Sequence, residues 1–578
     1  MRKSRPLPER LIARTVAFLG GLCLSSLAVT RPAAAAERVV LTYGFVEIST
    51  SLESLRTYAE TGKVSPELAP YLRFLDEDRR SQFRQALQVR QDVSPVQLSQ
   101  FLYSSIGQNI LRYAGGIVQT AGRRDGSKGL RGALVLSAAD PEGLSVLGII
   151  EKFPTGTVRI NSLRAVQAVG AFTQLIEETQ QATTAIQNQI SQTEISRPSI
   201  EALGDLTEAG PFAVTTQFLE IVDTERNRTL PTDLYLPPNP DAPLVVISHG
   251  LAGDRRGFIN IAQHLASHGF AVAALDHPGS DRRQLEDLLT GTAREIAQPN
   301  EFSQRPRDIS FLLDELTRLS SASGPLANQI DMSRVGVIGH SFGGYTALAL
   351  AGAQLNYETL EANCESEDFI FNAANPSMLL QCTALEAPEQ FDNALRDERV
   401  QAVMALNPVT SSLFGPMGFS QIVVPVLLVA GSEDPIAPAL LEQIQPFTWL
   451  NQPVDSPAAA ALDHYLVLLE GGSHVYDPID FEGANVALAS ELVNADVPLA
   501  YNYLEALSLG FMKTEVAPDP AYRSALSTAY INRLSQPPLP LYITDTLTEA
   551  MITDSSTTLD LEASSPLPTP PAPVPNPQ

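Results

Sequence analysis

A serine between two glycines stands where it could act as a nucleophile. Residues 339–343 read Gly-His-Ser-Phe-Gly, with Ser341 at the centre. The apolar run Val335–Ile338 precedes them, and a helix-like stretch begins at Tyr345. Small residues allow a tight turn that holds the hydroxyl at the carboxyl end of a strand, with a helix dipole aimed at a developing oxyanion. The pattern predicts an acyl-transferring serine; the alternative is a glycine-rich turn with an incidental serine.

The base should be a histidine that follows the serine along the chain. A serine hydroxyl attacks only when a base takes its proton, and in this arrangement the order is serine, acid, histidine. Of the seven histidines, only His464 and His474 follow Ser341. His464 precedes the run Tyr465–Glu470 and so lies at its amino end. His474 follows the run, at the end where Ser341 should emerge. We therefore expect His474 to be the base.

The acid should follow a strand that lies between the serine and the base. The run Val426–Ala430 leads directly into Gly-Ser-Glu-Asp-Pro at 431–435. Asp434 is the best candidate, and Glu433 is the close alternative. The preceding run ends at Asn407, without a carboxylate. An acid here would hold the imidazole in the correct tautomer and stabilise the imidazolium.

Two backbone N–H groups are needed to stabilise the oxyanion. One should belong to Phe342, the residue after the nucleophile. The other should come from residues 248–253, Ser-His-Gly-Leu-Ala-Gly, where we choose Leu251. Gly250 and Gly253 would let this backbone approach a substrate closely.

No cofactor or metal is expected. His264 and His268 stand four residues apart on a predicted helix, but no Glu follows His264 and no third ligand is evident. We find neither a phosphate-binding loop nor a dinucleotide fingerprint in a suitable context. The predicted chemistry uses side chains and backbone N–H groups alone.

Strand-like runs alternate with helix-like stretches through the central part of the chain. Eight runs are predicted as strands: Val214–Val222, Thr232–Leu236, Leu244–Ser248, Ala271–Asp276, Val335–Ile338, Val400–Leu406, Val424–Ala430 and Tyr465–Glu470. Several are continuously apolar, as strands buried on both faces should be, and the helices between them imply a mostly parallel sheet. Eight strands with the serine after the fifth predict an α/β-hydrolase fold over residues 205–535.

An insert interrupts this alternation at residues 354–396, where such enzymes often carry a lid. It holds Cys364 and Cys382, and an apolar cluster: Phe369, Ile370, Phe371, Met378, Leu379 and Leu380. Two cysteines in an exported chain favour one disulfide bond, and a pair of free thiols is the alternative. The prediction is a bridged, lid-like insert.

The first 36 residues predict export. A basic head precedes an uncharged apolar run from Thr15 to Thr30, and Ala33–Ala36 follow. This is the pattern of a secretory signal with a small-residue cleavage site. The apolar run is shorter than the roughly 20 residues of a membrane span. We expect a periplasmic or secreted protein without a stable membrane span.

The two ends of the mature chain have different compositions. Residues 37–195 are predicted to form a mainly helical accessory domain, with a strand or hairpin at Val39–Ile48 and one long helix from Ser162. Residues 536–578 are rich in Pro and Thr and are predicted to be a disordered tail.

The formal net charge of −26 limits the partners. An acidic chain repels nucleic-acid phosphates, so nucleic acid is not expected to bind. We expect the partner to be a small-molecule ester or a lipid substrate.

Four motifs resemble those of the plasma-type platelet-activating-factor acetylhydrolases and of dienelactone hydrolase relatives. They are Ser248–Leu251, Leu265–Phe270, Asp276-His277 and Gly339–Gly344. The resemblance covers about residues 210–480 and implies a calcium-independent serine esterase that cleaves short or oxidised acyl chains from phospholipids or similar esters. Leu251 and Phe342 match that family's oxyanion positions. Plasma-type enzymes take their acid after the sixth strand, where this chain has Asn407; here the acid is expected at Asp434.

The N-terminal part, from Glu37 to Leu144, resembles an uncharacterised domain, DUF1400, found ahead of exported hydrolases, chiefly in cyanobacteria. The whole chain is therefore predicted to be an exported serine carboxylic-ester hydrolase for short or medium acyl esters. The alternatives are an acyltransferase on the same site and a non-catalytic lipid-binding protein. The undamaged set of predicted catalytic residues disfavours the second alternative.

Overall fold

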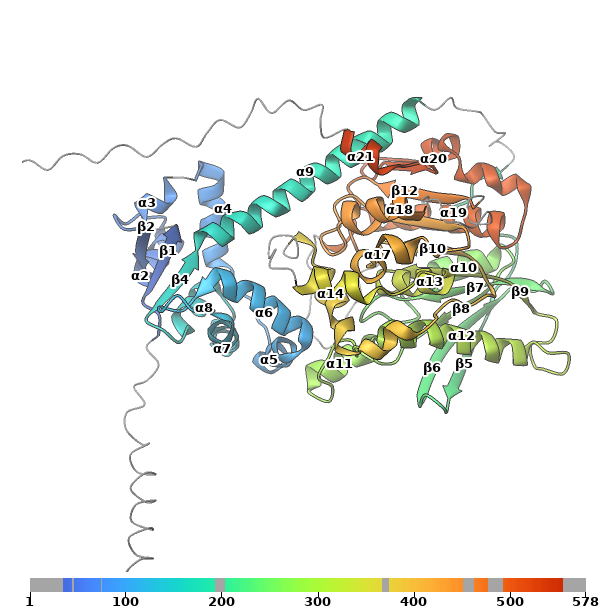
Figure 1. Cartoon of the computed structure of the whole chain (residues 1–578), viewed down its shortest axis with the longest axis horizontal. Helices are drawn as coiled ribbons and strands as arrows, with labels where there is room; N and C mark the ends of the chain where they lie inside the picture. The colour runs from blue at the N-terminus through green and yellow to red at the C-terminus, as the bar shows by residue number, and fades with distance from the viewer. Residues whose placement is uncertain are drawn as a thin grey trace, which may run out of the picture. The chain divides into compact units, whose positions relative to one another are not determined.

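The computed structural model describes residues 35–43, 46–73, 75–192, 203–365, 374–450, 462–476 and 492–554. Most of the predicted signal segment therefore lies outside the described residues, as do Phe369, Ile370 and Phe371 of the insert. The chain divides into two compact units (Figure 1). The first comprises residues 1–99 and 111–165, and the second comprises residues 100–110 and 166–578.

The first unit combines helices with a small sheet. Its strands are β1 (Arg38–Tyr43), β2 (Val46–Ser51), β3 (Val118–Gln119) and β4 (Thr157–Asn161), in the order β2-β1-β4-β3. Its helices are α2 (Leu52–Thr61), α3 (Ala69–Leu72), α4 (Glu77–Gln88), α7 (Ser127–Ala138) and α8 (Val146–Lys152), while α5 (Pro95–Tyr103) and α6 (Ser105–Ile117) are divided between the units. The predicted hairpin at Val39–Ile48 is confirmed. We did not predict β3 and β4, because β3 is very short and β4 pairs with the distant β1.

The long helix α9 (Ser162–Gln192) begins in the first unit and continues in the second (Figure 1). Leu175, Ala182 and Ile186 on this helix are buried in the core of the second unit. The predicted boundary at residue 195 is therefore wrong, because the apolar positions of α9 beyond residue 165 pack in the second unit.

The second unit is built on a mostly parallel sheet. The strands are β5 (Thr215–Asp223), β6 (Arg228–Leu236), β7 (Ala242–Ser248), β8 (Ala271–Leu275), β9 (Ile330–His340), β10 (Val400–Leu406), β11 (Val426–Gly431), β12 (His464–Leu469) and β13 (Leu541–Thr544). Their order is β13-β12-β11-β10-β9-β7-β8-β6-β5. The α/β-hydrolase arrangement and all eight predicted strands are confirmed, and β13 makes a ninth.

The ninth strand corrects the predicted start of the tail. β13 pairs antiparallel with β12, and Leu541 and Ile543 are buried. Helix α21 (Glu549–Asp554) follows it. The prediction of a disordered tail from residue 536 is therefore wrong for β13 and α21. Their short apolar alternation was not recognised because prolines and threonines surround it. Residues 555–578 lie outside the described chain.

Helices cover both faces of the large sheet (Figure 1). The helices of this unit include α10 (Ile259–Ser267), α11 (Arg282–Thr290), α12 (Glu301–Leu319), α13 (Phe342–Ala351), α14 (Tyr357–Glu365), α16 (Met378–Gln381), α17 (Ser411–Phe419), α18 (Gln445–Leu450), α19 (Val497–Glu515) and α20 (Thr528–Leu534). Alternate strand residues enter two separate cores, as a period of two requires. Leu244 packs in the core with α12 and α13, whereas Val245 packs in the core with α10 and α19. Both faces of the central strands are therefore fully buried.

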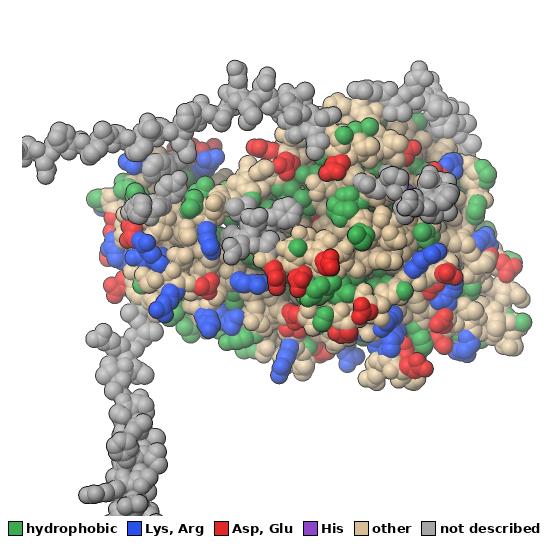
Figure 2. All heavy atoms as spheres, in the orientation of Figure 1, with side chains coloured by type: hydrophobic (Ala, Val, Ile, Leu, Met, Phe, Trp, Pro, Cys, Tyr) green, Lys and Arg blue, Asp and Glu red, His purple; other side chains and the backbone are tan. Residues whose placement is uncertain are grey.

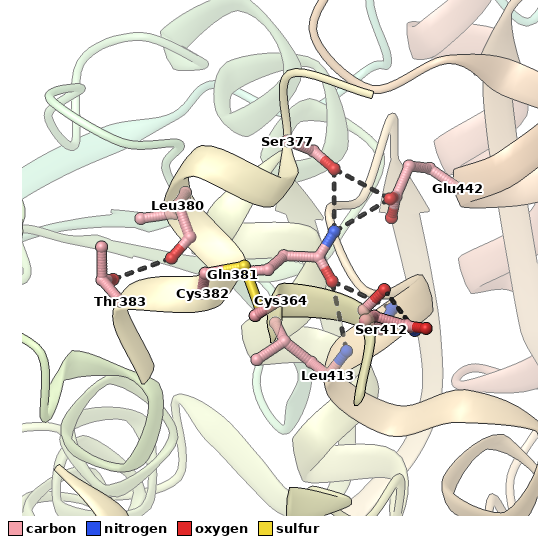
Figure 3. The surroundings of a disulfide bond; sticks show 10 residues. Cys364, Ser377, Leu380, Gln381, Cys382, Thr383, Ser412, Leu413 and Glu442 are labelled. Atoms are coloured by element: carbon pink, nitrogen blue, oxygen red, sulfur yellow. Dashed lines mark hydrogen bonds between the residues drawn. A yellow bond between two sulfur atoms is a disulfide. The ribbon is translucent and has the colours of Figure 1, made fainter. Parts of the chain in front are cut away.

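The predicted disulfide bond is present in the insert (Figure 3). Cys364 at the end of α14 is bonded to Cys382, 18 positions along the chain. Beside the bond, Gln381 Oε1 accepts hydrogen bonds from the backbone N–H groups of Ser412 (3.0 Å) and Leu413 (3.1 Å) at the start of α17. Gln381 Nε2 donates to the buried carboxylate of Glu442 at 2.9 Å. These contacts anchor the described part of the insert in the body of the unit.

Removing the disulfide should cost about 3 kcal/mol of unfolding free energy, because the unfolded chain regains the entropy of a loop of this size. The measurement is denaturant unfolding of Cys364→Ser/Cys382→Ser against the wild type. Reduced wild-type protein is the matched control and should unfold like the double variant. Equal stability of oxidised and reduced protein would contradict the prediction and assign the anchoring to contacts such as those of Gln381.

Candidate active site

Ser341 occupies a strained turn between β9 and α13. Its φ of 54° and ψ of −115° lie where residues with a Cβ are rarely found. A Cβ on Gly339 would lie 1.9 Å from the carbonyl oxygen of Gly343, and a Cβ on Gly343 would lie 2.0 Å from that of Ser248. Only glycine fits at both positions, so the two glycines of the motif are required for the turn that presents the serine.

The structure brings the three predicted catalytic residues together. His474 Nε2 lies 3.0 Å from Ser341 Oγ, and His474 Nδ1 lies 2.7 Å from Asp434 Oδ2. The three residues follow β9, β11 and β12, and the carboxyl ends of parallel strands meet at one edge of a sheet. All three are buried, whereas Glu433, the alternative acid, is exposed.

The Asp434 carboxylate is held by N–H donors on both oxygens. Oδ1 accepts hydrogen bonds from the backbone N–H groups of Ile436 and Ala437, both at 2.8 Å. Oδ2 accepts from Asn407 Nδ2 at 2.6 Å as well as from His474. Because the carboxylate only accepts, His474 Nδ1 must carry a proton, which leaves Nε2 free to accept one from the serine.

The loop that carries His474 is fixed on both sides. Asn494 Oδ1 accepts from the backbone N–H of Ser473 at 2.8 Å, and Asn494 Nδ2 donates to the carbonyl oxygen of Val475 at 2.9 Å. His340 Nε2 lies 2.8 Å from the His474 carbonyl oxygen. Burial, and then the neighbouring His474, lower the pKa of His340 to about 3, so His340 is neutral and donates this hydrogen bond.

The predicted oxyanion loop lies against the nucleophile. A Cβ on Gly250 would lie 3.3 Å from Ser341 Cβ, so this backbone approaches closely because it lacks a side chain. Ala252 has a φ of 58°, and its N–H donates to the carbonyl oxygen of Ser280 at 2.9 Å. Among the hydrogen bonds of the described residues, the N–H groups of Leu251 and Phe342 have no acceptor. Both predicted donors are therefore free to bind an oxyanion.

A buried arginine on α12 contacts both segments that carry the predicted oxyanion donors. Arg305 donates to the carbonyl oxygen of His249 and to Ser280 Oγ, the latter at 3.0 Å. Its guanidinium carbon lies 4.6 Å from the centre of the Phe342 ring. Burial lowers the pKa of Arg305 to about 10, which leaves it charged at neutral pH. Its positive charge therefore lies against the ring of Phe342 and the carbonyl oxygen of His249.

Arg305 and the ion pairs around it were not predicted from the sequence. His277 Nδ1 lies 3.0 Å from Asp308 Oδ2, and Arg228 pairs with both Asp308 and Glu301. The available signal was the spacing of Glu301, Arg305 and Asp308 at i, i+4 and i+7 on α12, in line with its buried apolar residues. Ionisable residues on such a stripe are buried and need partners.

Three further features of the described residues bear on the predicted chemistry. Within those residues, no group of three or more His, Cys, Asp or Glu side chains is suited to a metal ion. The His264 and His268 rings lie 4.7 Å apart, and His268 Nε2 lies 3.0 Å from the carbonyl oxygen of Glu208. A polar cavity of about 400 Å³ beside Arg226 and Arg228 contains none of the predicted catalytic residues.

Comparisons with known proteins agree with the fold. Residues 244–490 match the alpha/beta hydrolase family, and residues 35–161 match a family described as alpha/beta hydrolase of unknown function, DUF1400. The DUF1400 match covers most of the first unit and all of α5 and α6, whereas the large sheet begins only at β5.

Curated relatives include two kinds of esterase by name. Cutinase est1 of Thermobifida alba is 31% identical over 150 residues, which are 25% of this chain and 41% of that protein. Platelet-activating factor acetylhydrolase of Gallus gallus is 25% identical over 158 residues, 21% of this chain and 37% of that protein. The homologous protein of Cavia porcellus is 29% identical over 135 residues, 18% of this chain and 31% of that protein. The chain thus spans less than half the length of each.

The sheet order and the two family matches lead to one assignment. The second unit has the alpha/beta-hydrolase fold, and residues 244–490 and 35–161 are similar to the alpha/beta hydrolase and DUF1400 families, respectively.

Proposed function

We propose that this protein is an exported serine carboxylic-ester hydrolase. The observation that supports it most is the line of hydrogen bonds from Ser341 through His474 to Asp434, beside two unoccupied N–H donors. In this proposal Ser341 is the nucleophile, His474 is the general acid and base, and Asp434 orients the imidazole. The N–H groups of Leu251 and Phe342 form the oxyanion hole.

Acylation follows from this geometry. Ser341 Oγ attacks the ester carbonyl carbon while its proton passes to His474 Nε2, which already lies 3.0 Å away. The carbonyl oxygen becomes an oxyanion that accepts hydrogen bonds from the backbone N–H groups of Leu251 and Phe342. When the tetrahedral intermediate collapses, the imidazolium gives its proton to the leaving alcohol, and an acyl-serine remains.

Deacylation repeats these steps with water. His474 takes a proton from a water molecule, whose oxygen attacks the acyl carbon and forms a second oxyanion at the same N–H donors. Collapse returns the proton to Ser341 Oγ and releases the carboxylic acid. The net reaction is ester plus water giving acid plus alcohol.

The proposed substrates are neutral or zwitterionic esters with short or medium acyl chains, including sn-2 acyl esters of phospholipids. The names of the cutinase and acetylhydrolase relatives support an ester substrate. The net charge of −26 disfavours anionic substrates. On the face in Figure 2, acidic and basic side chains are interspersed over the second unit, without a broad basic patch to oppose that charge.

Activity against p-nitrophenyl esters of increasing acyl length should rise and then fall. Each buried CH₂ adds about 0.8 kcal/mol of binding until the pocket is full, after which longer chains meet steric cost. The measurement is kcat/KM from C2 to C16. A steady rise to C16 would contradict this substrate class and favour an open lipase groove. Phosphatidylserine analogues at low salt provide the matched test of charge and should be poorer substrates than phosphatidylcholine analogues.

Export is part of the proposal. The signal pattern of residues 1–36 and the disulfide bond between Cys364 and Cys382 support it, because disulfides persist in oxidising compartments. In the described part of the chain, no helix has both the length and the apolar character needed to cross a membrane.

The experiment that tests the function is labelling with a fluorophosphonate probe, followed by peptide mapping and an ester panel. We expect the probe on Ser341, hydrolysis of the shorter esters, and unchanged turnover in EDTA. An unlabelled but folded protein would overturn the proposal. Loss of turnover in EDTA that a divalent ion restores would overturn the metal-free mechanism.

A further inference from the structure

Asn407, the residue after β10, contacts the acid of the proposed triad. Its side chain is completely buried. Asn407 Nδ2 lies 2.6 Å from Asp434 Oδ2 and 3.1 Å from the carbonyl oxygen of Ser473. Both partners only accept hydrogen bonds, so the NH₂ end of the amide must face them. The chemistry of its neighbours thus fixes the orientation of the amide.

The opposite end of the amide is also held. The hydroxyl of Tyr476 donates to Asn407 Oδ1 at 2.8 Å, and Tyr476 is itself buried. The Tyr476 ring lies 5.8 Å from that of His340, whose ring lies 5.0 Å from that of His474. The Asn407 side chain therefore cannot rotate without breaking three hydrogen bonds in a closed network around the triad.

The backbone of Asn407 suggests a competing explanation. Its φ is 42°, in the left-handed region that asparagine tolerates better than most residues and glycine adopts most easily. If only this conformation mattered, glycine would replace asparagine well. The contacts of the amide lead to the opposite expectation, so the two explanations can be separated.

We propose that Asn407 is a positioning residue, whose amide holds Asp434 Oδ2 where His474 needs it. The inference rests on the function proposed above. Asn407 donates to the same oxygen that accepts from His474 Nδ1, so it fixes the position of that oxygen without contacting substrate. The same NH₂ group holds the carbonyl oxygen of Ser473, the residue before the base. One side chain therefore fixes the position of the proposed acid relative to that of the proposed base.

The decisive variant is Asn407→Gly, which keeps the backbone conformation and removes the amide. We expect kcat to fall about 10- to 100-fold, as for the loss of a hydrogen bond to a charged group. KM should stay within about threefold, because Asn407 does not contact substrate. The thermal midpoint is measured alongside. A stable Asn407→Gly protein with wild-type kcat would overturn the inference in favour of the conformational explanation.

The pH profile of kcat/KM is a measurement that should not change if Asn407 only supported the fold. The titratable groups around Asp434 and Asn407 are His474, His340 and Tyr476. Burial keeps the pKa of His340 at about 3 and raises that of Tyr476 far above its usual value, so neither changes charge between pH 5 and 9. A shift of the acid limb of the kcat/KM profile in an Asn407 variant therefore arises from neither His340 nor Tyr476.

Asn407→Asp tests that limb directly. It places a second carboxylate against Asp434, and the added negative charge makes the pair retain its proton to higher pH. We expect the acid limb to move up by about one pH unit or more, and an unmoved limb would contradict the inference. Should Asn407→Gly fail to fold, Tyr476→Phe removes only the hydroxyl that orients the amide. Its kcat should fall by a smaller factor at unchanged KM, and a wild-type kcat there would count against the inference.

Fluorophosphonate labelling separates this inference from the function on which it rests. If wild-type protein does not label at Ser341, the proposed function fails and the inference fails with it. If the wild type labels and Asn407→Gly labels at the same rate, only the inference is overturned. Labelling that slows in proportion to kcat supports both.

Discussion

Ser341→Ala should abolish ester hydrolysis and fluorophosphonate labelling. The variant removes the hydroxyl oxygen that lies 3.0 Å from His474 Nε2 and that is proposed to form the acyl bond. Residual turnover should be at least about 10⁵-fold below the wild type, because nucleophile and base act as one unit. The measurement combines active-site titration with turnover of the best p-nitrophenyl ester.

The strained backbone at Ser341 allows a sharper control. Ser341→Gly should be as inactive as Ser341→Ala but more stable than it, because glycine adopts a φ of 54° and a ψ of −115° without strain. Ser420→Ala, at a half-buried hydroxyl outside the site, should keep full activity. Retained labelling in Ser341→Ala would place the nucleophile elsewhere.

Local patterns were enough to predict most of the large sheet and the residues that cluster at its edge. Strands buried on both faces are continuous apolar runs. A tight turn that holds a serine needs glycines at fixed positions, so the Gly-x-Ser-x-Gly spacing identifies it. The order of serine, acid and histidine then left few choices, and Ser341, Asp434 and His474 do meet in the structure. Their catalytic roles remain predictions.

The features that were missed depend on contacts between distant parts of the chain. β13 was assigned to the tail because composition near Leu541 hid a short strand that forms only beside β12. In the sequence, Asn407 was noted only because it is not a carboxylate. Its hydrogen bonds to Asp434 and Ser473 form only when three separate strands come together. Arg305 stands on a helix far from the motif, and only the folded sheet brings it behind Phe342.

Asp434→Asn should lower kcat about 10⁴-fold by forcing the wrong imidazole tautomer. The reason lies in the donors around this side chain. Oδ1 faces the N–H groups of Ile436 and Ala437, so an amide would place its oxygen there and its NH₂ toward His474. His474 Nδ1 would then have to accept, and its proton would move to Nε2, facing Ser341. An imidazole with a proton on Nε2 cannot take one from the serine.

The matched control is the neighbouring carboxylate. Glu433→Gln changes the same functional group one position away, but Glu433 is exposed, so this variant should keep nearly full activity. Fluorophosphonate labelling of Asp434→Asn should slow by a similar factor while its thermal unfolding remains cooperative. Severe loss in Glu433→Gln with little loss in Asp434→Asn would move the acid by one residue. Comparable, mild losses in both would mean that His474 works without a carboxylate partner, and the triad proposed here would reduce to a serine–histidine pair.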